Sequence, residues 1–134
     1  MKKYENYVSN LNVLSRAGEQ DLSNEFIVSG IIDKFIVQFE LGWKLLKELL
    51  AYEGRPTAAT GSPRSIIKTA YQVYDFIDEE IWLEMLKARN DLTHIYNAAA
   101  ALKLTDDILN RYLSAFEKLE EGLVSYYGEE LLRG

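Results

Sequence analysis

Residues 88–97, A-R-N-D-L-T-H-I-Y-N, contain the single histidine of the chain, His94. Taken as one continuous helix at about 100° per residue, the segment gathers its polar side chains within an arc of about 160°. These side chains are those of Tyr96, Arg89, Thr93, Asn97, Asn90 and His94. Burying such groups without partners would cost several kcal/mol, so they should line a cleft or an interface. We expect the functional site here.

Arginine and histidine in this segment suit cleavage of RNA without a metal ion. In that reaction the ribose 2′-hydroxyl attacks the adjacent phosphate, so one proton must leave the attacking oxygen and another must reach the leaving group. His94 can carry out either transfer near neutrality, because an unperturbed imidazole has a pKa near 6.5. Arg89 stays charged, and its planar fork can hold two phosphoryl oxygens as negative charge builds up.

The expected geometry also points to a second copy of the chain. On an unbroken helix Arg89 and His94 lie about 140° apart, so one straight helix does not aim both at one phosphate. Either the helix bends or another subunit contributes. A two-fold homodimer would bring two imidazoles together for the base and acid roles. We therefore expect a composite site at a homodimer interface.

Structural roles for the same residues are a real alternative. His94 could be an ordinary buried histidine, and Arg89 could pair with Glu40 or Asp91 to hold two helices together. Tryptophans and tyrosines at helical spacing usually pack in a core, and Gly42 is best explained by close helix packing. Arg55 and Arg64, near the 54–62 connection, could bind phosphate, but we expect solvated surface positions for both.

Composition limits the remaining possibilities. The 134 residues fit one domain, 1–134, and the absence of cysteine excludes disulfides and thiolate metal sites. With one histidine, zinc chemistry is nearly excluded too, so no metal and no cofactor is expected. The formal charge of −6 argues against broad, charge-driven nucleic-acid binding but allows a local RNA site. No signal peptide or membrane span is visible, which favours a cytoplasmic protein.

Helical periodicity extends along most of the chain, and no alternation typical of strands competes with it. We expect an all-α, up-and-down bundle of four or five helices. The first two expected helices cover residues 2–17 and a long stretch that Ser23 caps and that ends near residue 53. The other three begin at Ser62-Pro63, at Asp78 and at Thr105. Residues 54–62 should form a flexible connection, and the wide apolar face of the long helix should meet both the bundle and another subunit.

Three motifs in this order resemble a known group of proteins. They are Arg89-Asn90, His94 and Tyr96 in the spacing R-N-x3-H-x-Y, Phe39-Glu40 with Trp43 in the long helix, and Ser62-Pro63-Arg64 before the third helix. Together they resemble the HEPN superfamily, and more closely the nucleotidyltransferase substrate-binding proteins, partners of minimal nucleotidyltransferases (MNT). The resemblance covers about residues 39–97. Ala98 departs from it, because an acidic residue is expected after the Tyr-Asn pair.

The resemblance implies an HEPN-like fold and a toxin of the MNT–HEPN toxin–antitoxin type. It assigns Arg89 and His94 as the catalytic pair of a metal-independent endoribonuclease and Asn90 as a polar auxiliary. It further implies that the nucleotidyltransferase silences the toxin, in some members by adenylylating the motif tyrosine. Here that tyrosine is Tyr96, and Asn97 is assigned to the same modification or binding site. The implied partners are the MNT protein, a second copy or a higher homo-oligomer, and RNA or a nucleotide.

Two other functions are compatible with the same residues. A noncatalytic subunit whose dimer cleft presents nucleotide or substrate to the nucleotidyltransferase would tolerate a neutral replacement such as His94→Asn. A structural scaffold without a ligand would tolerate alanine at Arg89, His94 and Tyr96 alike.

Overall fold

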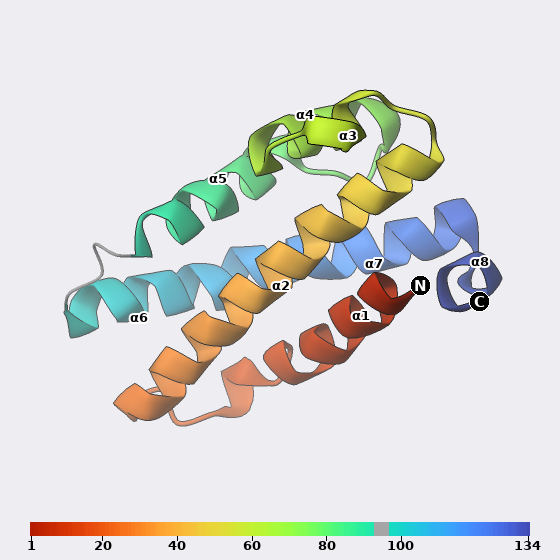
Figure 1. Cartoon of the computed structure of the whole chain (residues 1–134). Coiled ribbons are helices and arrows are strands. Elements are labelled where there is room, and N and C mark those ends of the chain that lie inside the picture. The colour runs from red at the N-terminus through yellow and green to blue at the C-terminus, as the bar shows by residue number, and fades with distance from the viewer. Residues whose placement is uncertain (93–96) are drawn as a thin grey trace.

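The longest element of the computed structural model is α2 (Glu25–Tyr52), which crosses the bundle diagonally in Figure 1. The structure describes residues 1–92 and 97–134, and within these ranges all regular structure is helical. The other helices are α1 (Lys2–Leu14), a 3-10 turn (Ala17–Glu19), α3 (Thr57–Thr60), α4 (Pro63–Val73), α5 (Glu79–Asn90), α6 (Ala98–Asp107), the π-helical segment η3 (Ile108–Tyr112), α7 (Leu113–Tyr127) and α8 (Glu129–Arg133). The predicted all-α fold is confirmed.

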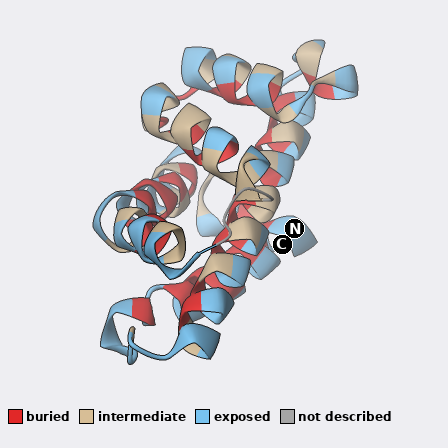
Figure 2. Cartoon of the chain, turned by 90° about the vertical axis from the view of Figure 1, so that its left-hand side faces the viewer, coloured by how far each residue is buried: buried red, intermediate tan, exposed pale blue. Residues whose placement is uncertain are grey.

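The helices enclose one apolar core, with α1 packed along α2 and the α6–α7 helix crossing behind them (Figure 1). Figure 2 shows the buried residues gathered on the inward faces of the helices. Aromatic rings fill the centre: Phe39 lies 5.8 Å from Trp82, and Trp82 lies edge-on to Phe116 at 5.6 Å between ring centroids. In the part of the chain that the structure describes, no helix is both long and apolar enough to span a bilayer.

Local capping residues set several helix starts as predicted. The Ser62 hydroxyl accepts a hydrogen bond from the Ser65 amide and Pro63 follows it, and the Asp78 carboxylate accepts one from the Ile81 amide. The cap of α2 is Asn24 rather than Ser23, because the Ser23 hydroxyl is bonded to the Asp21 carboxylate at 2.6 Å. Each start therefore follows from a single side chain that satisfies free amides.

Three predicted boundaries are wrong. The first helix ends at Leu14 instead of residue 17, and the 54–62 connection contains the short helix α3. The last helix begins at Ala98 instead of Thr105, whose hydroxyl donates to the Ala101 carbonyl inside the helix. The Thr-Asp-Asp sequence resembles a cap, but this back-bonding lets threonine remain in a helix interior.

The π-helical segment η3 connects the continuous α6–α7 helix to α5. It places Tyr112 in a stack on Phe35, with ring centroids 5.4 Å apart, and directs two side chains to Glu84 of α5. Arg111 Nη2 donates to Glu84 Oε1 at 2.8 Å, and the Tyr112 hydroxyl donates to Glu84 Oε2 at 2.7 Å. These bonds hold the pKa of the Glu84 carboxyl below its usual range. The helix α5, which carries Arg89 near its end, is thus held by both Arg111 and Tyr112.

Gly42 lets α2 approach Trp82 of α5 closely. A Cβ atom at this position would lie 2.7 Å from the tip of the Trp82 ring and 3.2 Å from the Tyr7 ring. Both rings are fully buried, so neither has free space to move into. The predicted packing role of Gly42 is confirmed.

Gly42→Ala is expected to destabilise the fold by about 1–3 kcal/mol, because overpacking shifts a rigid core ring. Gly30→Ala on the same helix is the matched control. No atom lies within 4 Å of the added methyl group there, so better helix propensity should stabilise by about 0.5–1 kcal/mol. Urea unfolding measures both, and equal effects at the two glycines would contradict the packing account.

Candidate functional site

The helix that carries Arg89 ends earlier than the sequence pattern predicted. α5 ends at Asn90, and the Asp91 amide closes its last turn on the Lys87 carbonyl at 2.9 Å. Asn97 has extended backbone, and its side chain caps α6 by accepting a hydrogen bond from the Ala100 amide at 2.8 Å. The predicted continuous helix over residues 88–97 is therefore wrong, because Asn97 caps a new helix instead of extending α5.

This break changes the expected geometry of the cluster. The arc of about 160° and the separation of about 140° both assumed one unbroken helix, so neither applies. Arg89, Asn90 and Asn97 are described, whereas Thr93, His94 and Tyr96 lie outside the described residues.

Arg89 is held by Glu40 across the contact between α5 and α2. Its Nη2 atom lies 2.7 Å from Glu40 Oε1, and its Nη1 atom donates to Asn90 Oδ1 at 3.0 Å. The Arg89 side chain is 31% exposed, so the guanidinium still reaches solvent. Of the two carboxylates that we considered as partners, the structure selects Glu40, since Asp91 pairs with Lys87 at 2.6 Å.

Glu40 is itself fixed by residues of its own helix. The Trp43 indole donates to Glu40 Oε2 at 3.1 Å, and Lys44 Nζ lies 3.7 Å from the same oxygen. Oε1 is buried, and no donor of the described residues is aligned for a hydrogen bond to it. The adjacent Arg89 charge compensates that oxygen. The F-E-x-x-W motif thus has a physical meaning: positions three apart on a helix bring an indole N–H onto a carboxylate that orients Arg89.

An open cavity of about 520 Å³ lies where the start of α4 meets the end of α5. It is lined by Ser62, Pro63, Arg64, Leu83, Leu86, Lys87, Arg89 and Asn90. The S-P-R motif and the Arg-Asn pair, separate in sequence, therefore share one cavity. Arg64 is exposed, as expected, and it also lines this cavity, whereas we did not single out Lys87. The sequence does place Lys87 three residues before Asn90, hence on the same side of a helix.

A mainly apolar groove of about 530 Å³ is lined by described residues on both sides of 93–96, and two carboxylates, Glu25 and Asp33, also line it. It lies between the first half of α2 and the start of α6, and Leu92 and Asn97 both line it. Its apolar wall consists of Leu22, Val28, Ile32, Ile36, Leu92, Ala98, Ala101 and Leu102. Ala98, where the resemblance leads us to expect a carboxylate, is thus a small residue in the wall of this groove.

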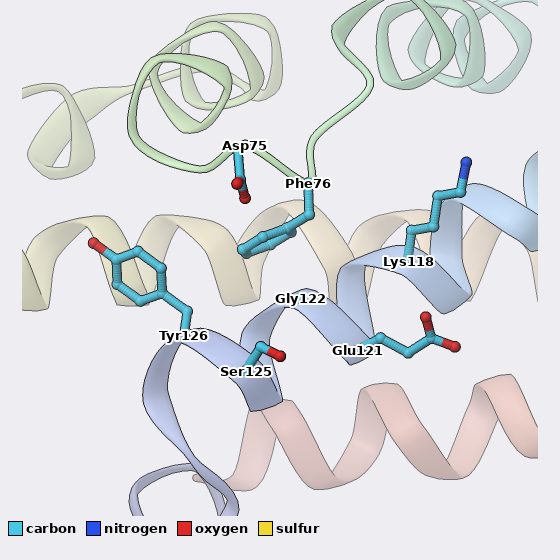
Figure 3. A pocket seen from close by; sticks show the side chains of 7 residues that line it. All are labelled: Asp75, Phe76, Lys118, Glu121, Gly122, Ser125 and Tyr126. Carbon is cyan, nitrogen blue, oxygen red and sulfur yellow. The ribbon is translucent and has the colours of Figure 1, made fainter.

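A third hollow, shown in Figure 3, has a different chemical character. It has a volume of about 520 Å³ and contains none of the motif residues. The Phe76 ring lies over Gly122, where a Cβ atom would come within 2.1 Å of the ring. Its charged residues are Asp75, Lys118 and Glu121, so carboxylates outnumber cations there. This composition disfavours an anionic ligand in the Figure 3 hollow.

Comparison with known proteins adds one finding to this geometry. Residues 2–125 match the protein family described as nucleotidyltransferase substrate binding protein like. No curated protein matches the chain. The match includes all three motifs and every residue of the cavity between α4 and α5.

Removing Arg89 should destabilise the fold more when Glu40 is present than when it is absent. Arg89→Ala leaves the buried Glu40 oxygen uncompensated, whereas Arg89→Ala in a Glu40→Gln background removes both charges. A double-mutant cycle by urea unfolding should give a coupling of about 1 kcal/mol. A coupling near zero would show that the contact does not position Arg89.

Proposed function

The chain belongs to the nucleotidyltransferase substrate-binding protein family, and on that premise we propose that it is an HEPN-type toxin that cuts RNA without a metal ion. Its partner is then a minimal nucleotidyltransferase that silences it. One observation carries the proposal: a partly exposed arginine of the R-N-x3-H-x-Y motif is held by a fixed carboxylate beside a cation-lined cavity. A purely structural arginine has no need of such a cavity.

The proposed chemistry uses Arg89, His94 and Asn90. The ribose 2′ oxygen forms a bond to phosphorus while the bond from phosphorus to the 5′ oxygen breaks. An imidazole accepts the 2′ proton, and an imidazolium donates a proton to the departing 5′ oxygen. The products are a 2′,3′-cyclic phosphate and a 5′-hydroxyl end. Arg89 stabilises the charge that accumulates on the phosphoryl oxygens, and Asn90 supplies an amide donor nearby.

Each chain has a single histidine, so the acid and base roles call for two copies of the chain. The apolar groove between α2 and α6 supports this arrangement because residues on both flanks of 93–96 line it. A second copy seated in the groove would bring the two histidine-bearing segments towards each other. Leu102, which is 47% exposed, offers apolar surface for that contact. The proposed active unit is a homodimer.

Silencing would act on Tyr96. The tyrosine oxygen attacks the α-phosphorus of ATP in the partner's active site, and pyrophosphate leaves, so Tyr96 gains a nucleotide. An added nucleotide brings negative charge and bulk two residues from His94, which would repel RNA from the site. Asn97 next to it already serves as the cap of α6, and we propose that its amide helps to position the modified segment.

Expression of the chain with and without a minimal nucleotidyltransferase partner tests the function. Without the partner we expect slow growth and RNA fragmentation, both relieved by Arg89→Ala or His94→Ala. With the partner we expect an intact-mass increase of nucleotide size that Tyr96→Phe abolishes. Intact RNA and unchanged growth in every arm would contradict the nuclease and leave the noncatalytic substrate-binding subunit.

Leu102→Glu should convert the dimer to a monomer and abolish RNA cleavage, since it replaces exposed apolar surface of the proposed contact with a charge that would have to be buried. Leu131→Glu is the matched control, because Leu131 is similarly exposed, at 40%, but lies on α8. Light scattering after size exclusion measures both variants. A monomeric wild-type chain that still cuts RNA would contradict the composite site.

A further inference from the structure

The cavity between α4 and α5 has an unusual charge for this chain. Three cationic residues line it, Arg64, Lys87 and Arg89, and no carboxylate is part of its described lining. The chain as a whole carries a formal charge of −6. The Figure 3 hollow has about the same volume but two carboxylates and one lysine. The excess of cationic residues at this cavity favours an anionic ligand.

The three cations differ in how firmly they are engaged. Arg89 is fixed by Glu40, whereas the pair of Lys87 and Asp91 is exposed, with side-chain exposures of 76% and 49%. Exposed pairs of this kind contribute little and exchange partners easily. Arg64 has no carboxylate within 4.0 Å in residues 1–92 and 97–134. Its guanidinium can engage a ligand without giving up another ion pair.

Most backbone donors of the nearby helix start are already used or missing. The Ser62 hydroxyl already accepts the Ser65 amide, and the Ile66 amide is bonded to the Ser62 carbonyl. Pro63 has no amide proton to offer. Recognition therefore falls to side chains, above all to the forked guanidinium of Arg64, which matches two phosphate oxygens.

We propose that this cavity is a phosphate subsite for single-stranded RNA, with Arg64 as its main binding residue and Lys87 as the second cation. The inference rests on the proposed function, because it takes RNA as the ligand, and it adds a contact outside the Arg89–His94 pair. Arg64 and Arg89 come from different helices and line one cavity, so a strand can place successive phosphates on them.

Binding of a fully 2′-O-methylated single-stranded oligonucleotide tests the subsite without cleavage, because the attacking hydroxyl is blocked. We expect Arg64→Gln to weaken binding about tenfold, as expected for a charge-assisted contact. The slope of log K against log salt should fall in magnitude by about 0.7, the value for one lost phosphate contact on a single strand. Lys87→Gln should have a smaller effect of the same kind.

Two control variants each remove one positive charge, an arginine or a lysine, at a site away from this cavity. Arg16→Gln lies after α1, and Lys118→Gln lies in the Figure 3 hollow. Both should leave affinity and salt slope unchanged within about twofold. Equal losses in Arg64→Gln and Arg16→Gln would overturn the subsite, as would a wild-type chain that does not bind the oligonucleotide. Circular dichroism confirms that each variant is folded.

The binding and cleavage measurements distinguish the phosphate subsite from the proposed nuclease activity. Oligonucleotide binding that depends on Arg64, in a chain that never cuts RNA, would support the subsite and reject the nuclease. Cleavage with an unchanged KM in Arg64→Gln would support the nuclease and overturn the subsite. Binding of AMP that depends on Arg64, without oligonucleotide binding, would overturn the RNA assignment in favour of a nucleotide site.

Discussion

The ionic contact between Glu40 and Arg89 connects the fold of this protein to its proposed chemistry. It joins the long central helix α2 to the end of α5, and a buried carboxylate oxygen depends on it for compensation. Trp43 fixes the carboxylate from one side, while Gly42 lets Trp82 pack against the neighbouring turn. The guanidinium is consequently held at the surface of a cavity instead of sampling many rotamers, and such preorganisation is what phosphoryl-transfer chemistry requires.

The π-helical segment supports the same arrangement from the other side of α5. A straight α-helix through residues 108–112 would present different side chains to α5, because each π turn shifts the register that follows it. Here the shift brings Arg111 and Tyr112 together on Glu84. The helix that carries Arg89 is thus anchored to both long helices of the bundle. The position of α5 therefore depends on packing that involves most of the chain.

The sequence predicts the features that depend on local residue patterns. It does not predict where a capping residue competes with continuation of a helix, or which residues far apart in the chain come together. Helical periodicity gave the bundle, and single capping residues gave the starts of α4 and α5. The prediction of one continuous helix misses the end of α5, because it places Asn97 on a helical face instead of at a cap. Its position before three alanines, which are strong helix formers, is itself a capping signal. Arg64 and Arg89 line one cavity because α4 packs against α5, which no local pattern encodes.

We propose that the Arg89 guanidinium and the His94 imidazole promote RNA cleavage by internal attack of the ribose hydroxyl. The most direct measurement is the chemistry of the RNA ends that the purified protein produces in the presence of a metal chelator. The account predicts 2′,3′-cyclic phosphate and 5′-hydroxyl ends, at a rate that the chelator does not change. Fragments with 3′-hydroxyl and 5′-phosphate ends, or cleavage that stops when metal ions are removed, would contradict it.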